Sequence, residues 1–475
     1  MPTTPKNVEM NTSAQNADYL NAIRSSASAA YQNAVPLAEY GVASSREIGQ
    51  IIMNNSTLLN EFYSAMVNQF AFIFGSSKMF YNKWRDFKKG LIGLGELVEE
   101  FFVQIALPNN YNPEIAATEI FKRVIADVRS AIYRINIKTF YKTTINRPMI
   151  EMAFTTEGGM ADLIGKVFTS MAAGCEVDQM SAIKYLLARK ILDGQIKTVP
   201  ISQVSGTDTE ANAKAAAMQM KEDFDNFMFP RSDYNSAGVV NWCSGPNDVT
   251  FMLTTSFGAK YDISVLAAAF NLEYANFMGQ VKKVDSLSNI DFARLKAFFD
   301  DSENVEEFTE EEIEALDNVA AITFDNGLIQ WYDRLYEWHE EPNGQSMEWQ
   351  NWLHYWALLA SSPFANAVAY VQSVDNTLGT ITSVDVTPSA VTLPTGASIP
   401  ITADVEGTGI FDKGVIWTNE GERPEGTEFK MTYDGNTTYF TNIGMGTLKV
   451  TVTATSKQDS TKKATVSITG STVTD

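Results

Sequence analysis

The sequence is poor in histidine and cysteine, with two of each among 475 residues. Histidine is the side chain that exchanges protons most readily near neutral pH, so two histidines offer little for acid–base catalysis. Cys175 and Cys243 do not form the closely spaced pair that a zinc knuckle or a redox motif requires, and we expect reduced, structural thiols. This scarcity disfavours zinc proteins, thiol oxidoreductases and histidine-dependent enzymes.

Catalytic motifs are missing as well. His339 opens a possible H-E-x-x-H zinc-protease motif, but Asn343 occupies the position of the second histidine. The sequence contains no G-x-S-x-G nucleophile motif. Pairs of carboxylates carry no weight for a glycosidase, because 57 acidic side chains make some pairs inevitable. We therefore predict a protein without catalytic residues, cofactor or metal.

Long apolar runs and an excess of positive charge are also lacking. No stretch of about eighteen apolar residues occurs, and the first twenty residues lack the basic and apolar regions of a signal peptide, so we expect a cytoplasmic protein without membrane contact. The net charge of -21 repels nucleic-acid phosphates. Acidic residues interrupt the densest basic cluster, at residues 78–89, which we interpret as a solvated or subunit-facing surface.

Apolar spacing predicts several helices. From Met160 to Ile191 apolar residues recur every three or four positions before Gly194, which indicates one long or broken helix with a glycine stop. Residues 195–212 change to Pro, Gly, Ser and Thr, as in a strand or connection, and a helical run follows. Thr309 and Glu312 fit a capping box at the start of a short helix.

The last third of the chain favours strands. An Asn-Gly turn at 343–344 separates two segments rich in Trp and Tyr. From about residue 382, alternating Val and Thr with regular turn signals predict a β-sandwich of ~90 residues that contains Trp417, with residues 373–381 as its linker. The small, polar first twenty residues are typical of an N-terminal arm.

Three glycines, Gly90, Gly93 and Gly95, lie within the segment FKKGLIGLGELVEEFFV at 87–103. Their order is the reverse of the G-x-G-x-x-G dinucleotide loop, so we interpret them as a turn. The flanking segments are strand-capable and rich in large aromatic residues. The sequence therefore predicts a long hairpin, and one that needs another subunit to cover it.

Short words in a fixed order carry a resemblance to a known family. They are NAIR at 21–24, VPLA at 35–38, FKKG at 87–90 with LG and EE downstream, EVD at 176–178, VLAAAFN at 265–271 and FANAVAYV at 364–371. Each word alone is weak, but together they extend over almost the whole first 372 residues. In this order the chain resembles the major capsid protein of small phi-29-like podoviruses.

This resemblance implies an α+β protein with a Hong Kong 97-type capsid fold and an all-β, immunoglobulin-like sandwich of the bacterial group 2. The resemblance implies two domains, a shell domain at 1–375 and the immunoglobulin-like domain at 382–475. Within the shell domain it implies an N-terminal arm at 1–50, an E-loop at 76–108, a P-domain spine helix within 158–194 and an A-domain at about 225–345.

The resemblance also implies a function. Copies would assemble into pentamers and hexamers of an icosahedral or prolate head in the host cytoplasm and remain in the virion capsid, with scaffold and portal proteins as partners and weak, non-specific contact with the packaged dsDNA. The terminal domain would either bind a host-surface glycan or connect neighbouring capsomers. An acidic shell fits this function, because it does not hold back DNA during packaging and ejection.

The implied subunit contacts lie in the E-loop. We expect them at Trp84, Arg85, Phe87, Lys88, Lys89, Gly90, Gly93, Gly95, Glu99 and Glu100. Some capsids of this fold form a covalent cross-link from an E-loop lysine, and Lys88 and Lys89 lie in the corresponding region, although plain surface charge is the more ordinary role.

Two other interpretations stay open at this point. Immunoglobulin-like domains of this group also occur in adhesins, so a bacterial surface or carbohydrate-binding protein is one alternative. A cytosolic enzyme with a carbohydrate-recognising appendage is the other. The missing signal peptide counts against the first, and the sparse histidines count against the second.

Overall fold

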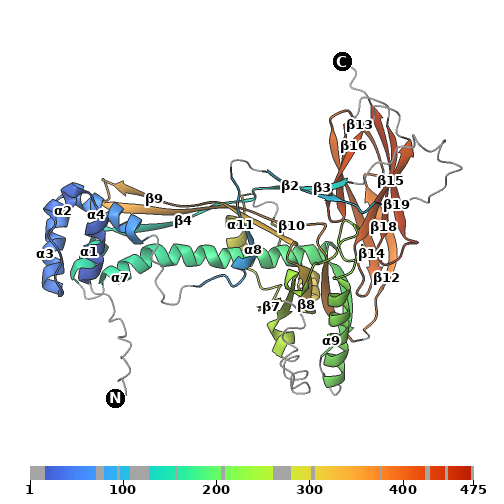
Figure 1. Ribbon diagram of the computed structural model, residues 1–475, viewed down its shortest axis with the longest axis horizontal. Coiled ribbons are helices and arrows are strands. Elements are labelled where there is room, and N and C mark those ends of the chain that lie inside the picture. The colour runs from blue at the N-terminus through green and yellow to red at the C-terminus, as the bar shows by residue number, and fades with distance from the viewer. Residues whose placement is uncertain are drawn as a thin grey trace.

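The computed structural model describes residues 16–471 apart from 71–79, 94–96, 107, 109–127, 156–158, 205–208, 260–279, 301–304, 375, 423–427 and 444–447. Over these residues the chain is α+β with several sheets, as the sequence predicted. Figure 1 shows an elongated molecule with a cluster of helices at one end, a long helix through the middle and a β-sandwich at the other end.

Packed helices form the N-terminal end of the described chain. They are α1 (Asn16–Ser26), α2 (Ala29–Ala34), α3 (Val42–Met53) and α4 (Ser56–Phe70), which gather with α6 (Arg147–Thr155) and α7 (Gly159–Ile164). Leu20, Ile23, Ile48 and Ile52 are buried, because their spacing gives each helix one apolar face. Of the first twenty residues, for which a polar arm was predicted, residues 1–15 lie outside the described part and residues 16–20 belong to α1.

The long central helix follows from the predicted periodicity. Helix α7 continues through a π-helical turn, η2 (Gly165–Thr169), into α8 (Ser170–Leu192). Gly194 ends it with a φ of 72°, a left-handed conformation that glycine adopts without strain. The prediction of one long or broken helix with a glycine stop is confirmed.

A sheet of long strands runs beside α8 (Figure 1). Its order is β1 (Lys88–Leu91), β9 (Ile329–Asn343), β10 (Glu348–Ser361) and β4 (Ile137–Asn146). β9 and β10 form an antiparallel hairpin whose turn lies at the predicted Asn343-Gly344. Alternating residues of β10, such as Leu353 and Tyr355, are buried in the core that they share with α8.

A second sheet with shorter strands adjoins the end of α8. Its order is β5 (Lys197–Ser202), β11 (Ala367–Ser373), β8 (Val319–Asp325), β6 (Val249–Thr254) and β7 (Gln280–Val284). Helices α9 (Thr209–Asn226) and α12 (Glu310–Asp317) contact this sheet, whereas α11 (Phe292–Phe298) contacts α8 and β4. The capping box of α12 is confirmed, since Thr309 Oγ1 accepts a hydrogen bond from the Glu312 amide (3.2 Å) and Glu312 Oε2 accepts one from the Thr309 amide (2.9 Å).

The C-terminal strands form the predicted sandwich. They are β12 (Thr380–Thr387), β13 (Ala390–Pro394), β14 (Ser398–Thr408), β15 (Val415–Glu422), β16 (Phe429–Asp434), β17 (Thr437–Asn442), β18 (Lys449–Ser456) and β19 (Lys463–Ser471). One sheet has the order β13-β19-β18-β15, and the other begins β12-β14-β17-β16. Trp417 is buried in the core between them.

The second of these sheets does not stop at the sandwich. It continues into β3 (Val128–Arg134) and β2 (Leu97–Val103), two strands from far earlier in the chain. β2 and β3 pair antiparallel, and we call them the ribbon. The sandwich is therefore joined to the rest of the subunit by more than the linker that the sequence predicts.

Candidate functional site

The segment with the predicted subunit contacts does not form a hairpin. β1 pairs parallel with β9, whereas β2 pairs antiparallel with β3 in a different sheet. The predicted pairing of the two arms around the glycines is therefore wrong. Both arms do contain strands, but each finds its partner in a distant part of the chain, and no local pattern specifies that partner.

The glycines of this segment play different parts. Gly90 lies inside β1 with a φ of 137°, a conformation that L side chains rarely adopt. Gly93 lies just after β1, and open space surrounds the position where its Cβ would be. Gly95 lies outside the described residues. Of the two turn glycines that the structure describes, Gly90 is the one with a positive φ.

The start of the segment is anchored to α8. Glu176 on α8 accepts a hydrogen bond from the Asn82 amide (3.1 Å) and forms an ion pair with Arg85 (3.3 Å). Trp84 is buried beside a short 3-10 turn, η1 (Arg85–Phe87), and Phe87 is buried as well. Both aromatic side chains pack within the chain and are therefore not available for contact with another copy. Among the residues predicted to make subunit contacts, only the exposed ones remain candidates.

Lys88 is also used inside the subunit. Its ammonium group lies 2.8 Å from an Asp333 carboxylate oxygen and 4.5 Å from the centre of the Trp331 ring. Tyr355 donates a hydrogen bond to the other oxygen of Asp333 (2.7 Å), and burial raises the pKa of Tyr355 well above its ordinary value. Lys89, by contrast, is exposed. The two adjacent lysines therefore differ in their availability for contact with another molecule.

The ribbon has a polar and aromatic inner face. Glu100 accepts a hydrogen bond from the Tyr133 hydroxyl (2.5 Å), and burial, together with the nearby Glu100 charge, raises the pKa of Tyr133. The Phe102 and Phe364 rings stack with their centres 5.7 Å apart. Glu99, on the outer face, is exposed and forms an ion pair with Lys430 of β16 (2.6 Å).

The outer face of the ribbon carries exposed apolar side chains beside the charged Glu99 and Arg134. Strand pairing places Val103 beside Val128 on this face, and Leu97, Phe101 and Ile132 share it. Phe101 is 69% exposed and Leu97 is 58% exposed. An apolar surface of this extent is typical of a site where another protein docks. Of the residues on this face, the sequence prediction named Glu99 alone.

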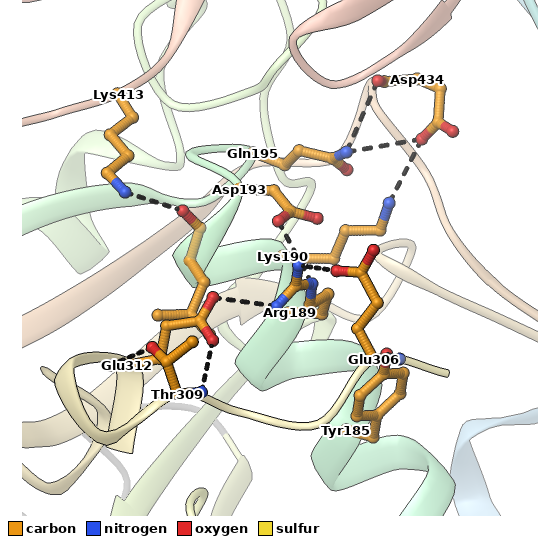
Figure 2. A network of polar contacts seen from close by, with 11 residues as sticks. Tyr185, Arg189, Lys190, Asp193, Gln195, Glu306, Thr309, Glu312, Lys413 and Asp434 are labelled. Carbon is orange, nitrogen blue, oxygen red and sulfur yellow. Dashed lines mark hydrogen bonds and ion pairs between the residues drawn. The ribbon is translucent and has the colours of Figure 1, made fainter. Parts of the chain in front are cut away.

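A second arrangement, which the sequence analysis missed, lies at the C-terminal end of α8 (Figure 2). Arg189 forms ion pairs with Asp193 (3.4 Å), Glu312 (3.0 Å) and Glu306. Burial lowers the pKa of Arg189, but the carboxylates around it outweigh that effect, so the pKa is raised. The cluster ties the acidic segment around α12 to the helix end.

The same helix end holds the sandwich. Lys190 forms an ion pair with Asp434 of β16 (3.2 Å), and Lys413 donates a hydrogen bond to the carbonyl oxygen of Leu192 (3.3 Å). Basic residues before Gly194 are a recognisable helix-end signal. Their partner Asp434, however, lies 244 residues away, and nothing in the sequence indicates the pairing.

The described residues contain little that resembles an active site. No group of three or more His, Cys, Asp or Glu side chains among them could hold a metal ion. His339 and His354 lie on neighbouring strands, with ring centres 5.3 Å apart, and His354 also packs against Phe140. Cys175 and Cys243 are free and buried, and burial raises the pKa of Cys175 to about 12.

None of the described helices has the length and apolar character needed to cross a membrane.

Comparisons with known proteins match most of the chain. The major capsid protein of Bacillus phage B103 is 28% identical over 409 residues, which cover 85% of this chain and 83% of that protein. The major capsid protein of Bacillus phage GA-1 is 27% identical over 395 residues, which cover 81% of this chain and 75% of that protein. Among solved structures, a chain in the capsid of Staphylococcus phage Andhra is similar, with 16% sequence identity and a TM-score of 0.47. The match covers 62% of this chain and 84% of that chain.

A family model gives the assignment. The model of the Phi29-like phage major capsid protein family matches residues 20–371, from within α1 to within β11. This range includes the ribbon, the long sheet and α8. The chain therefore belongs to the Phi29-like phage major capsid protein family.

Proposed function

We propose that copies of this major capsid protein assemble into pentamers and hexamers, which form an icosahedral or prolate head around the phage dsDNA genome. The family match over residues 20–371 carries this proposal. It favours a capsid subunit over an exported surface protein, and the family is not an enzyme family. Assembly in the host cytoplasm, with scaffold and portal proteins as partners, belongs to the same proposal.

The proposed fold is of the Hong Kong 97 type. Helices α7 and α8 would be the spine within residues 158–194, and the long sheet would belong to the P-domain. The five-stranded sheet would be the A-domain. The C-terminal end of the A-domain would then differ from the proposed residue 345, because β9 pairs with β10 in the long sheet. The sandwich would be the immunoglobulin-like domain at 382–475.

The proposed subunit contact lies in the E-loop at 76–108. Its support is the outer face of the ribbon, because an exposed apolar surface that a second copy covers would contribute to association in proportion to its area. Arg85, Lys89, Gly90 and Gly93 are exposed in the same segment and are the remaining candidates of the predicted set. We propose no cross-link through Lys88, whose ammonium group is paired with Asp333.

The variant Phe101→Asp tests this contact. It places a charge at the centre of the apolar face, so we expect the yield of shells to fall about tenfold or more, as for loss of a central interface residue. The unassembled chain should unfold within about 0.5 kcal/mol of wild type, because Phe101 is exposed. The control is Tyr439→Asp, an exposed aromatic of the sandwich at 40%. Normal shells from Phe101→Asp would exclude this face as the contact.

Weak contact with DNA completes the proposal. A chain with a net charge of -21 and a pI of about 4.6 repels the phosphate backbone, so packaged DNA would slide along the shell.

Electron microscopy and sedimentation of the purified full-length protein test the proposal as a whole. Closed shells, or sheets of hexagonal rings, are the expected result at high protein concentration, with the scaffold protein added if the chain alone stays unassembled. A chain that remained a monomer in both conditions would contradict the proposal.

A further inference from the structure

The sandwich and the ribbon share one sheet. Ser130 of β3 lies opposite Thr432 of β16 in a parallel pairing, which extends the sandwich sheet from β16 to β3 and on to β2. Figure 1 shows β2 and β3 reaching sideways to the sandwich from the middle of the molecule. The ribbon therefore takes its direction from the strand order of a domain that begins about 250 residues later.

The sandwich and the ribbon also share a hydrophobic core. The buried cluster around Trp417 contains Ala131 and Tyr133 of the ribbon. It also contains Leu358 and Phe364, which belong to β10 and the loop after it. Moving the ribbon away from the sandwich would expose these side chains to water, which is unfavourable in proportion to the apolar area. The contact is thus part of a core and not a loose touch between two surfaces.

Arg129 is the polar centre of this junction. From the inner face of β3, its guanidinium lies 5.2 Å from the centre of the Tyr433 ring of β16 and donates a hydrogen bond to the carbonyl oxygen of Ala237. One side chain thereby connects the ribbon, the sandwich and the loop before β6. The Glu99–Lys430 ion pair adds a link on the outer side.

The sandwich is itself fixed to the rest of the subunit. Lys190 and Asp434 hold it to the end of α8, as described above. Lys457 donates a hydrogen bond to the carbonyl oxygen of Asn235, and its buried neighbour Asp412 accepts one from the amide of Gly414 (2.8 Å). The sandwich therefore has a defined position from which it can orient the ribbon.

From these contacts we infer that the C-terminal sandwich is a positioning element. It holds the ribbon at a fixed angle to α8, so that the exposed apolar face of the ribbon is presented to a second copy of the chain in one direction. The inference rests on the proposed role of the ribbon in subunit contact. Under it, a change at the sandwich side of the junction weakens assembly without touching the contact face.

Amide hydrogen exchange of the unassembled full-length chain tests the positioning directly. We expect Arg129→Ala to speed exchange in residues 97–103 and 128–134 by about tenfold, because one charged hydrogen bond and a ring contact are lost. Arg129→Lys should restore most of the protection, since a lysine keeps the charge over the ring. The control is Arg134→Ala, an exposed arginine at the other end of β3, which should leave exchange unchanged.

A disulfide provides the second test. Ser130→Cys combined with Thr432→Cys places two thiols on directly paired residues, a spacing that a disulfide can bridge. Oxidised glutathione should close the bond within one chain, which mass spectrometry of the digest detects. The locked chain should then assemble as well as the reduced chain.

The outcomes separate the inference from the proposed function. Unchanged ribbon exchange in Arg129→Ala, absence of the disulfide, or a locked chain that no longer assembles would each overturn the positioning role. If the wild-type chain itself failed to assemble, the proposed function would be lost, but exchange and disulfide formation would still report whether the sandwich holds the ribbon.

Discussion

At the scale of single residues, the structure separates side chains that look alike in the sequence. Lys88 and Lys89 are adjacent and identical, but the register of β1 against β9 shifts between Lys88 and Gly90, and the two side chains differ in their surroundings. Lys88 reaches Asp333 and the Trp331 ring, whereas Lys89 is exposed. The burial of one lysine and not of the other decides which of them takes part in the stability of the subunit.

The substitution Lys88→Met measures this difference. It keeps roughly the length of the side chain but removes the charged partner of Asp333, which then keeps only its hydrogen bond from Tyr355, so we expect the free energy of unfolding to fall by about 1.5–3 kcal/mol. Lys89→Met serves as the matched control and should change it by no more than about 0.5 kcal/mol. Urea unfolding followed by tryptophan fluorescence provides both values, and equal effects of the two substitutions would show that Lys88 is not paired.

Lys457 gives the junction a dependence on pH. Burial lowers the pKa of Lys457 from 10.5 to about 8, although the nearby Asp412 carboxylate raises it. Between these two values the folded chain binds fewer protons than the unfolded chain, so a rise in pH through this window favours the folded chain. Below about pH 8 the lysine is charged in both states, and the cost of its burial is fully present.

The stability of wild type should therefore change with pH relative to that of the variant Lys457→Met, because methionine has no group that titrates between pH 8 and 10.5. The melting temperature of wild type minus that of the variant should rise as the pH goes from 8 to 10.5. Taking the difference cancels the titration of other groups. A difference that stays constant or falls across this window would show that Lys457 has an ordinary pKa.

At the scale of elements, the C-terminal end of α8 is where the parts of the subunit meet. Arg189 connects it to the acidic segment around α12, and Lys190 connects it to β16 (Figure 2). Gly194 permits this meeting in two ways. Its φ of 72° turns the chain, and a Cβ at this position would lie 2.3 Å from the Cβ of Lys413, closer than atoms can approach.

We expect Gly194→Ala to destabilise the chain more than a change of backbone conformation alone would. Gly396 is a matched control, since it has a φ of 82° but open space around its Cβ position. Gly396→Ala should cost about 1–2 kcal/mol for the left-handed conformation. Gly194→Ala should cost more, because Lys413 must also move. Thermal unfolding compares the two, and equal losses would mean that the close approach of Lys413 has no energetic weight.

At the scale of the whole molecule, charge opposes the association of identical copies. Each chain has a net charge of -21, so neighbouring subunits repel each other, and under the proposed contact the exposed apolar side chains of the ribbon would hold them together. The repulsion acts over a Debye length, which shrinks from about 30 Å at 0.01 M salt to about 8 Å at 0.15 M. The apolar contacts do not weaken in this range of salt.

We therefore expect the yield of assembled shells to rise with ionic strength between these two concentrations. Light scattering of the purified chain at fixed protein concentration measures the yield. A yield that fell with salt would show instead that opposite charges across the subunit contact contribute more than the net repulsion, and would direct attention to exposed pairs such as Glu99 and Lys430.

Much of the local structure could be predicted because it depends on neighbours in the chain. The α8 helix, its stop at Gly194, the capping box at Thr309 and the strand turn at Asn343 all follow from spacing within a few residues. The helices of residues 16–53 were missed, because their polar composition masked an apolar spacing that packing against α4 and α6 makes effective.

Pairing over long distances is what the sequence alone left undecided. Residue composition indicated that the segments on either side of the glycines could be strands, and alternating Val and Thr indicated that the last ninety residues or so could be a sandwich. Only the tertiary structure decided that β1 joins β9 and that the ribbon joins the sandwich sheet. The reason is physical: a strand edge accepts any partner strand, and the burial of a common core selects among them.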